Sequence, residues 1–208
     1  MDGVLETLVL AFIIGLTGAL APGPTLVATI QASVRGGWTV GPKVTLGHIA
    51  IETLVFLLIL FGFSAAALTY SHPVALLGGS ALIGFGILTV KESMHAHLDR
   101  QSPSAFSNPY LAGVITAITN PYFWIWWLTV GSTLVIEALE SGILLAVIFM
   151  VGHWSADAGW LTAVSTGIHR GRTILSENGY QRVLLLCGAF LIFFGSYYLI
   201  TAIAGMMA

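Results

Sequence analysis

The chain has 208 residues, of which 57% are apolar and only 8% are charged, whereas a soluble domain carries about 25% charged residues. Seven basic and nine acidic side chains cannot cover a water-facing surface, so the composition excludes a soluble enzyme and indicates a membrane protein. The formal net charge of −2 provides no basic field for nucleic acid, and the single cysteine, Cys187, excludes an intramolecular disulfide, a CxxC pair and a thiolate zinc site.

Long stretches without charge divide the chain into apolar spans. No Asp, Glu, Lys or Arg lies between Glu6 and Arg35, or between Glu52 and Lys91. The second gap holds two spans separated by a turn at 70–73, because a bilayer needs about 20 apolar residues per helix. Continuous apolar runs favour helices over a barrel. The sequence therefore predicts an all-α membrane protein with six transmembrane helices, at residues 4–31, 43–69, 74–91, 109–134, 141–166 and 181–205.

The basic residues predict the orientation of these helices. All seven lie in the first, third and fifth connections: Arg35 and Lys43, Lys91 and Arg100, and Arg170, Arg172 and Arg182. The second connection, the fourth (with Glu137 and Glu140) and both termini contain none. Because Lys and Arg accumulate on the cytoplasmic side, we expect a multi-pass protein of the cell (inner) membrane with both termini extracytoplasmic.

The first apolar helix could instead be a signal peptide, since Ala19-Leu20-Ala21 resembles a cleavage site. However, Asp2 and Glu6 precede it and no basic residue does, which is the reverse of a signal peptide. We therefore expect the first helix to be retained.

The two halves of the chain carry the same motifs in the same order. Helix breakers interrupt the first and fourth helices, and a Gly-His pair followed four residues after the His by an acid occurs in the second and fifth. Three helices per copy is an odd number, so the copies must have opposite orientations. The sequence predicts one membrane domain over 1–208 made of two inverted repeats with broken helices, 1–92 and 108–208, joined by a cytoplasmic connection at 93–107.

The breaker in the first helix is Ala21-Pro22-Gly23-Pro24. Because proline removes a helical hydrogen bond, it should open the helix inside the bilayer. A new helix starting at Pro24 would leave the amides of Thr25, Leu26 and Val27 free to bind a carboxylate. The alternative is a kink that only shapes packing, and the same alternative applies to Asn120-Pro121 in the fourth helix.

The ionisable residues at membrane depth form two pairs, His48 with Glu52 and His153 with Asp157. Residues four apart share a helix face. Burying a charge at the bilayer centre costs about 2.5–3.5 kcal/mol on insertion scales, so such groups usually mark an ion or substrate path. We expect all four to take part in proton coupling, although a purely structural clasp between each acid and its histidine is the alternative.

Two further groups are weaker candidates. His95, His97 and Asp99 in the third connection could bind a metal, although a solvated loop is the simpler interpretation. Trp124, Trp126 and Trp127 in the fourth helix could shape a pocket, although packing is the simpler interpretation.

These motifs resemble the LysE/RhtB family of amino-acid exporters over nearly the whole chain. The resemblance implies export of a small amino acid or related metabolite, coupled to the proton gradient, by a non-enzyme without a cofactor. It places the family motifs on Pro22, Gly23, Pro24, Gly47, Glu52, Asn120, Pro121 and Asp157. With Thr25, whose amide follows the break, the expected substrate-binding residues are eight: Pro22, Gly23, Pro24, Thr25, Glu52, Asn120, Pro121 and Asp157. The sequence departs from the family pattern at Thr25 and Tyr122, where many members carry Asn and Lys.

A second function is compatible with the same residues. His48, Glu52, His153 and Asp157 offer imidazole and carboxylate ligands that suit a divalent transition metal, and the wider superfamily includes metal exporters. No HExxH, nucleophile elbow or Cys-His pair indicates an enzyme. The expected partners are a small-molecule substrate and the lipid bilayer, without nucleic acid, and a homo-oligomer is compatible with the sequence.

Overall fold

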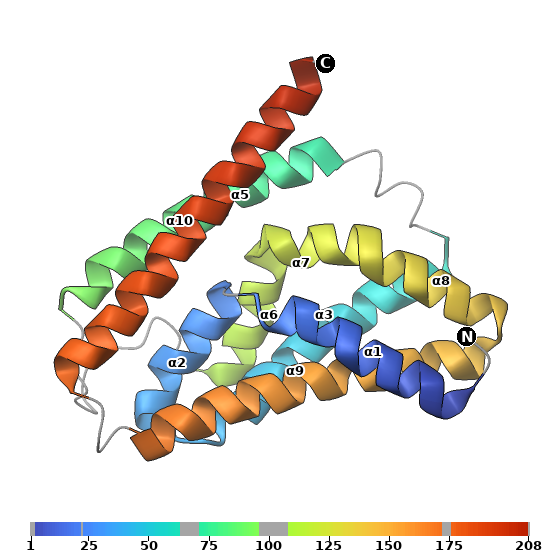
Figure 1. Ribbon diagram of the computed structural model, residues 1–208, viewed down its shortest axis with the longest axis horizontal. Coiled ribbons are helices and arrows are strands. Elements are labelled where there is room, and N and C mark those ends of the chain that lie inside the picture. Colours follow the sequence, from blue (N-terminus) through green and yellow to red (C-terminus); the bar gives the residue numbers. More distant parts are fainter. Residues whose placement is uncertain (1–2, 22, 63–70, 96–107, 172–175, 208) are drawn as a thin grey trace.

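The structure is a computed structural model that describes residues 3–21, 23–62, 71–95, 108–171 and 176–207. Every regular element in these ranges is helical (Figure 1). In chain order the elements are α1 (Val4–Ala19), α2 (Pro24–Gly36), α3 (Val40–Leu60), α5 (Ser71–Ser93), α6 (Pro109–Thr119), α7 (Pro121–Trp126), the π-helical turn η1 (Trp127–Gly131), α8 (Ser132–Glu140), α9 (Ile143–Gly171) and α10 (Glu177–Met207).

The lengths and composition of these helices are those of a multi-pass membrane protein. Within the described ranges, four helical stretches are long and apolar enough to cross a bilayer: α3, α9, α10 and the run α7–η1–α8. The α1–α2 pair becomes a fifth if it is counted as one broken span. The prediction of an all-helical membrane protein is confirmed, and the number of candidate spans among these residues is four or five where six were predicted.

The predicted break in the first helix is confirmed as a sharp bend. α1 ends at Ala19, α2 begins at Pro24, and the two helix axes are bent by 80°. Gly23, the residue before α2, is extended (φ −124°, ψ 179°). Pro24 takes the first helical position, where the missing N–H costs nothing because that N–H would have no helical partner. Pro22 lies outside the described residues.

The fourth predicted helix is broken at Asn120, which is extended between α6 and α7. Its side-chain oxygen accepts a hydrogen bond from Tyr122 N at 3.1 Å and so caps the new helix. The second part continues through η1 and α8 to Glu140, not to residue 134. Glu137 and Glu140 were predicted to lie in a connection, and this was wrong: they belong to the end of α8, because the chain turns only at Gly142 (φ +126°).

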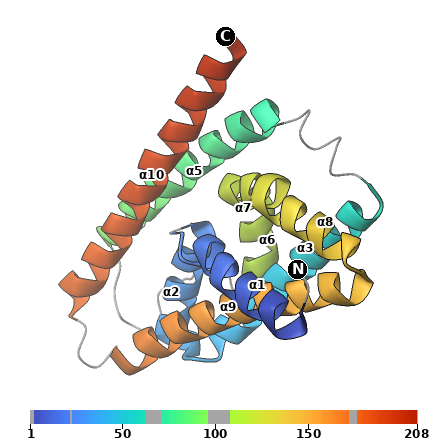
Figure 2. The same ribbon diagram turned by 45° about the vertical axis from the view of Figure 1, so that its right-hand side comes forward.

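Three helix pairs join the first half of the chain to the second. α1 packs along α9, α3 along α6, and α5 along α10. The α5–α10 pair lies to one side of the other helices in both views (Figures 1 and 2). Glycines allow this pair to approach closely, since a Cβ on Gly86 would lie 2.7 Å from Gly188 O, and one on Gly188 would lie 2.9 Å from Gly86 O.

The break between α1 and α2 lies against the largest buried apolar cluster. This cluster joins α1, α3, α6, α7, η1, α8 and α9, and its largest fully buried side chains are Trp127, Phe149 and Met150. A second cluster packs α2 against α5 and α10 through Leu82, Leu184 and their neighbours. The start of α2 is therefore held at the centre of the molecule, between the two groups of helices.

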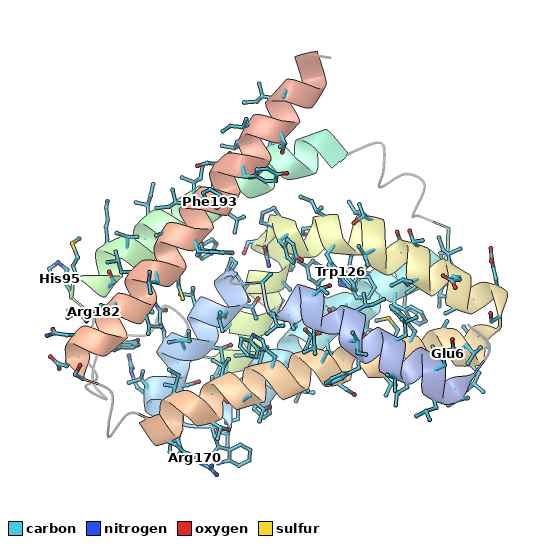
Figure 3. All side chains as sticks on the ribbon, in the orientation of Figure 1. Glu6, His95, Trp126, Arg170, Arg182 and Phe193 are labelled. Carbon is cyan, nitrogen blue, oxygen red and sulfur yellow. The ribbon has the colours of Figure 1, made fainter. Side chains whose placement is uncertain are left out.

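Ionisable side chains lie at both ends of the long axis of the molecule. Figure 3 shows His95, Arg170 and Arg182 at one end and Glu6 at the other. Arg35, Lys91 and Arg170 occupy the last turns of α2, α5 and α9. The orientation of the termini stays a prediction.

We expect both termini and the α8–α9 connection to face outward. Single cysteines at the exposed positions Ser141 and Asn178, in a Cys187→Ala background, test this on intact cells with a membrane-impermeant maleimide. Position 141 should be labelled, and position 178 should be labelled only after the membrane is opened. Labelling of 178 but not 141 on intact cells would reverse the topology.

We expect Gly86→Ala to destabilise the α5–α10 pair, because the new Cβ would meet the backbone of the facing helix. Overpacking of this kind typically costs about 1–3 kcal/mol. Gly84→Ala on the same helix is the matched control, because a Cβ there meets nothing within 4 Å. Thermal unfolding in detergent should show a lower midpoint for Gly86→Ala alone. Equal midpoints for the two variants would show that the close approach is wrong.

Candidate functional site

A cavity lies where the α1–α2 break meets the α6–α7 break. Its walls come from α1, α2, α3, α7, η1 and α9, and its volume is about 50 Å³. A cavity needs roughly 10–15 Å³ of such volume to hold one buried water. The cavity therefore has room for a few waters or one small metabolite. Among the described residues no Lys or Arg lines it, whereas His48, Glu52, His153 and Asp157 all do.

The carboxylate of Glu52 contacts side chains from three elements of the cavity wall, α3, η1 and α9. Its Oε1 accepts a hydrogen bond from Trp127 Nε1 at 3.3 Å and lies 2.9 Å from His153 Nε2 and 3.4 Å from His48 Nε2. Only 1% of Glu52 is exposed, and its second oxygen, Oε2, is buried without a hydrogen-bond partner. One carboxylate thus connects α3 with η1 and α9, and one of its two oxygens has no hydrogen-bond partner among the described residues.

The imidazole of His153 lies between two indoles. It stacks on Trp126 with ring centroids 4.7 Å apart and meets Trp127 edge-on at 5.1 Å. Its Nε2 lies 3.4 Å from Asp157 Oδ2, an ion-pair distance without hydrogen-bond geometry. Gly15 of α1 leaves room for this ring, since a Cβ there would lie 2.9 Å from His153 Nδ1.

The two predicted His–acid pairs therefore form one cluster. The spacing predicted contacts within each helix, but the shortest contact is the 2.9 Å one between His153 of α9 and Glu52 of α3. This contact is within hydrogen-bond distance, which is what direct proton transfer between two side chains requires. One ligand atom from each of His48, Glu52 and Asp157 also lies within 4.8 Å of the others, an arrangement that could hold a metal ion.

The start of α2 opens on the same cavity. Gly23, Thr25 and Leu26 line it, and no side chain caps this helix end. The prediction that the Val27 amide is free was wrong, because Val27 N donates to Gly23 O at 3.2 Å: the carbonyl of a capping residue accepts the first helical bond. Thr25 Oγ1 donates to Thr116 Oγ1 at 3.0 Å and so ties α2 to α6.

Five of the eight predicted substrate-binding residues line the cavity: Gly23, Thr25, Glu52, Asn120 and Asp157. Pro24 and Pro121 are buried in the first turns of α2 and α7 and do not line it. Pro22 lies outside the described residues.

Of the two weaker candidate groups, only the tryptophans contribute to the cavity wall. Trp126 and Trp127 line it, whereas the indole of Trp124 donates to Ile118 O at 2.8 Å. His95 is exposed, and His97 and Asp99 lie outside the described residues.

Three aromatic residues of the cavity wall, Tyr122, Phe123 and Trp160, were not predicted from the sequence to line a pocket. The phenol of Tyr122 donates to Thr17 O at 3.0 Å, and Trp126 Nε1 donates to Thr17 Oγ1 at 3.2 Å. These bonds hold the end of α1 against α7 beside the cavity. Phe123 and Trp160 complete the aromatic wall. The one available signal was that Trp160 follows Asp157 by three residues and so shares its helix face.

Comparison with known proteins gives one match. The family model described as LysE type translocator matches residues 16–202, nearly the whole chain. No curated protein and no solved structure matches the chain significantly.

Proposed function

Because the chain belongs to the LysE type translocator family, whose members are membrane exporters of small molecules and not enzymes, we propose that it exports a small zwitterionic amino acid or a close relative in exchange for protons. One observation carries this proposal. A single cavity within the membrane domain contains both the uncapped start of α2 and the buried acids Glu52 and Asp157.

A zwitterion needs one end of each sign. The start of a helix has a positive dipole end that favours a carboxylate, and Gly23 brings this end to the cavity without a side chain in the way. The carboxamide nitrogen of Asn120 lies beside Gly23, 3.1 Å from where a Cβ would stand. The ammonium group would bind the unpartnered oxygens of Glu52 and Asp157. The volume of about 50 Å³ favours a substrate with a small side chain.

Proton coupling is supported by the same cluster. Four ionisable groups meet within the membrane domain, and Glu52, His153 and Asp157 are 1%, 2% and 5% exposed. Such groups are costly to bury and usually belong to an ion or proton path. Glu52 and His153 are close enough to exchange a proton, and Asp157 and His48 extend the path on either side.

We also propose the inverted-repeat architecture for this exporter. Each of the three principal helix pairs joins one half of the chain to the other, and Gly47 of α3 and Gly152 of α9 occupy equivalent close contacts, with α6 and α1 respectively. The cavity lies between the proposed repeats, 1–92 and 108–208, which is where inverted-repeat transporters bind substrate. Both termini would then face outward from the cell membrane.

A divalent metal exporter is the second candidate, favoured by the proximity of His48, Glu52 and Asp157. A metal would also use His153, which contacts both acids. It would gain nothing from the start of α2, because a cation is repelled by that end of a helix.

We expect Glu52→Gln and Asp157→Asn to reduce amino-acid flux at least tenfold while expression and the unfolding midpoint change little. The amide keeps the size and one acceptor oxygen of the acid but removes the negative charge and the transferable proton. Flux into proteoliposomes under an imposed pH gradient measures this effect. Glu137→Gln at the end of α8 is the control. Wild-type flux in both site variants would show that Glu52 and Asp157 have only a structural role.

Substrate panels separate the two candidate functions. We expect saturable flux of small amino acids, a partial reduction when His48 and His153 are both replaced by Gln, and a severe loss in Gly23→Leu, where the side chain would crowd Asn120. Gly159→Leu is the control, since a Cβ there meets nothing within 4 Å. Flux of Mn²⁺, Co²⁺, Ni²⁺ or Cd²⁺ that disappears in the double histidine variant, without flux of any amino acid, would establish the metal exporter instead.

A further inference from the structure

One polar atom of the cavity wall has no role in the cluster around Glu52. The indole Nε1 of Trp160 is buried and has no hydrogen-bond partner among the described residues, although Trp160 lines the cavity. An indole N–H can only donate. A buried donor without an acceptor is unfavourable, and a native protein rarely keeps one without a reason.

Two residues of the same cavity carry buried acceptor atoms that lack a donor. Glu52 Oε2 and Asp157 Oδ2 form no hydrogen bond. Trp160 lies three residues after Asp157 on α9, so both side chains project from one face of the helix, about 5–6 Å apart at their Cβ atoms. The residues that line the cavity thus include one with an unpartnered donor, Trp160, and two with unpartnered acceptors, Glu52 and Asp157.

Four other side-chain donors of the wall are already engaged. Trp126 and Tyr122 donate to Thr17, Trp127 donates to Glu52, and Thr25 donates to Thr116. Among the described residues no Lys or Arg lines the cavity. The amides at the start of α2 are open to a substrate carboxylate, and among the indoles of the wall Trp160 is the one whose N–H is not already donated.

We propose that Trp160 is a substrate-binding residue that donates its indole N–H to the substrate carboxylate while Asp157 and Glu52 bind the ammonium group. This assignment rests on the proposed function and predicts which ligands the exporter prefers. A ligand must carry an acceptor beside its cationic group, so an α-amino acid binds better than the amine that lacks its carboxylate. A bare metal ion has no acceptor to offer and leaves this N–H unpaired.

Trp160→Phe tests the assignment, because it removes the N–H and keeps an aromatic ring. Trp154→Phe is the matched control, since the Trp154 Nε1 is also buried without a partner on α9 but Trp154 does not line the cavity. Purified protein in detergent is titrated with alanine, with ethylamine, which lacks the carboxylate, and with propionate, which lacks the amine. Losing a hydrogen bond to a charged group should raise the Kd roughly tenfold or more.

We expect this rise for alanine and propionate in Trp160→Phe, an unchanged Kd for ethylamine, and wild-type values in Trp154→Phe. A second measurement does not depend on the variant being stable for titration. Among the six tryptophans, the ¹⁵N-indole resonance assigned to Trp160 by its loss in Trp160→Phe should move downfield when alanine binds to the wild type. It should not move with ethylamine.

The results that would contradict the role of Trp160 differ from those that would contradict amino-acid export. If the wild type binds and transports alanine but its Trp160 resonance does not move and Trp160→Phe keeps the wild-type Kd, the assignment is wrong and the exporter remains. If propionate binds through Trp160 but no amino acid is transported, the assignment stands and the proposed substrate is wrong. If neither alanine nor propionate binds, the assignment is overturned.

Discussion

The arrangement of the site depends on the burial of one carboxylate within the membrane domain. A charged group removed from water must be surrounded by donors that the protein itself supplies, because hydrocarbon offers none. Trp127 of η1 donates its indole N–H to Glu52 Oε1, and the Nε2 atoms of His153 of α9 and His48 of α3 lie 2.9 and 3.4 Å from the same oxygen. These contacts connect α3 with η1 and α9, and Oε2 is buried without a hydrogen-bond partner among the described residues.

The two chain breaks and the π-helical turn serve this arrangement. The extended residues Gly23 and Asn120 interrupt two apolar spans, and their polar backbone groups are tolerated at membrane depth because they are enclosed by protein at a cavity. The turn η1 follows the second break and brings Trp126 and Trp127, adjacent in sequence, onto the same imidazole. Gly131 provides the space, since a Cβ there would lie 2.6 Å from the ring of Trp127.

Close helix contacts then hold the site together without a large apolar driving force. Lipid is as apolar as a leucine side chain, so association in a membrane relies on packing between small residues. Gly47 and Gly152 let α6 and α1 approach the two helices that carry the ionisable residues, and Gly86 and Gly188 do the same for α5 and α10. The helices bearing the acids are thus buttressed separately from the α5–α10 pair, which contacts the rest of the protein mainly through α7 and α2.

The sequence alone determined the membrane class, the all-helical character and the two breaks, because these follow from apolar length, charge spacing and proline, all of which act locally. It also identified Glu52, Asp157 and both histidines, since ionisable groups are conspicuous in apolar spans. Only the tertiary structure decided that His153 binds Glu52 more closely than its own neighbour Asp157, that Glu137 and Glu140 lie in a helix, and that Trp160 reaches the cavity. Those features depend on how α3, η1 and α9 cross, and a crossing is set by the packing of side chains distant in sequence, which no local pattern records.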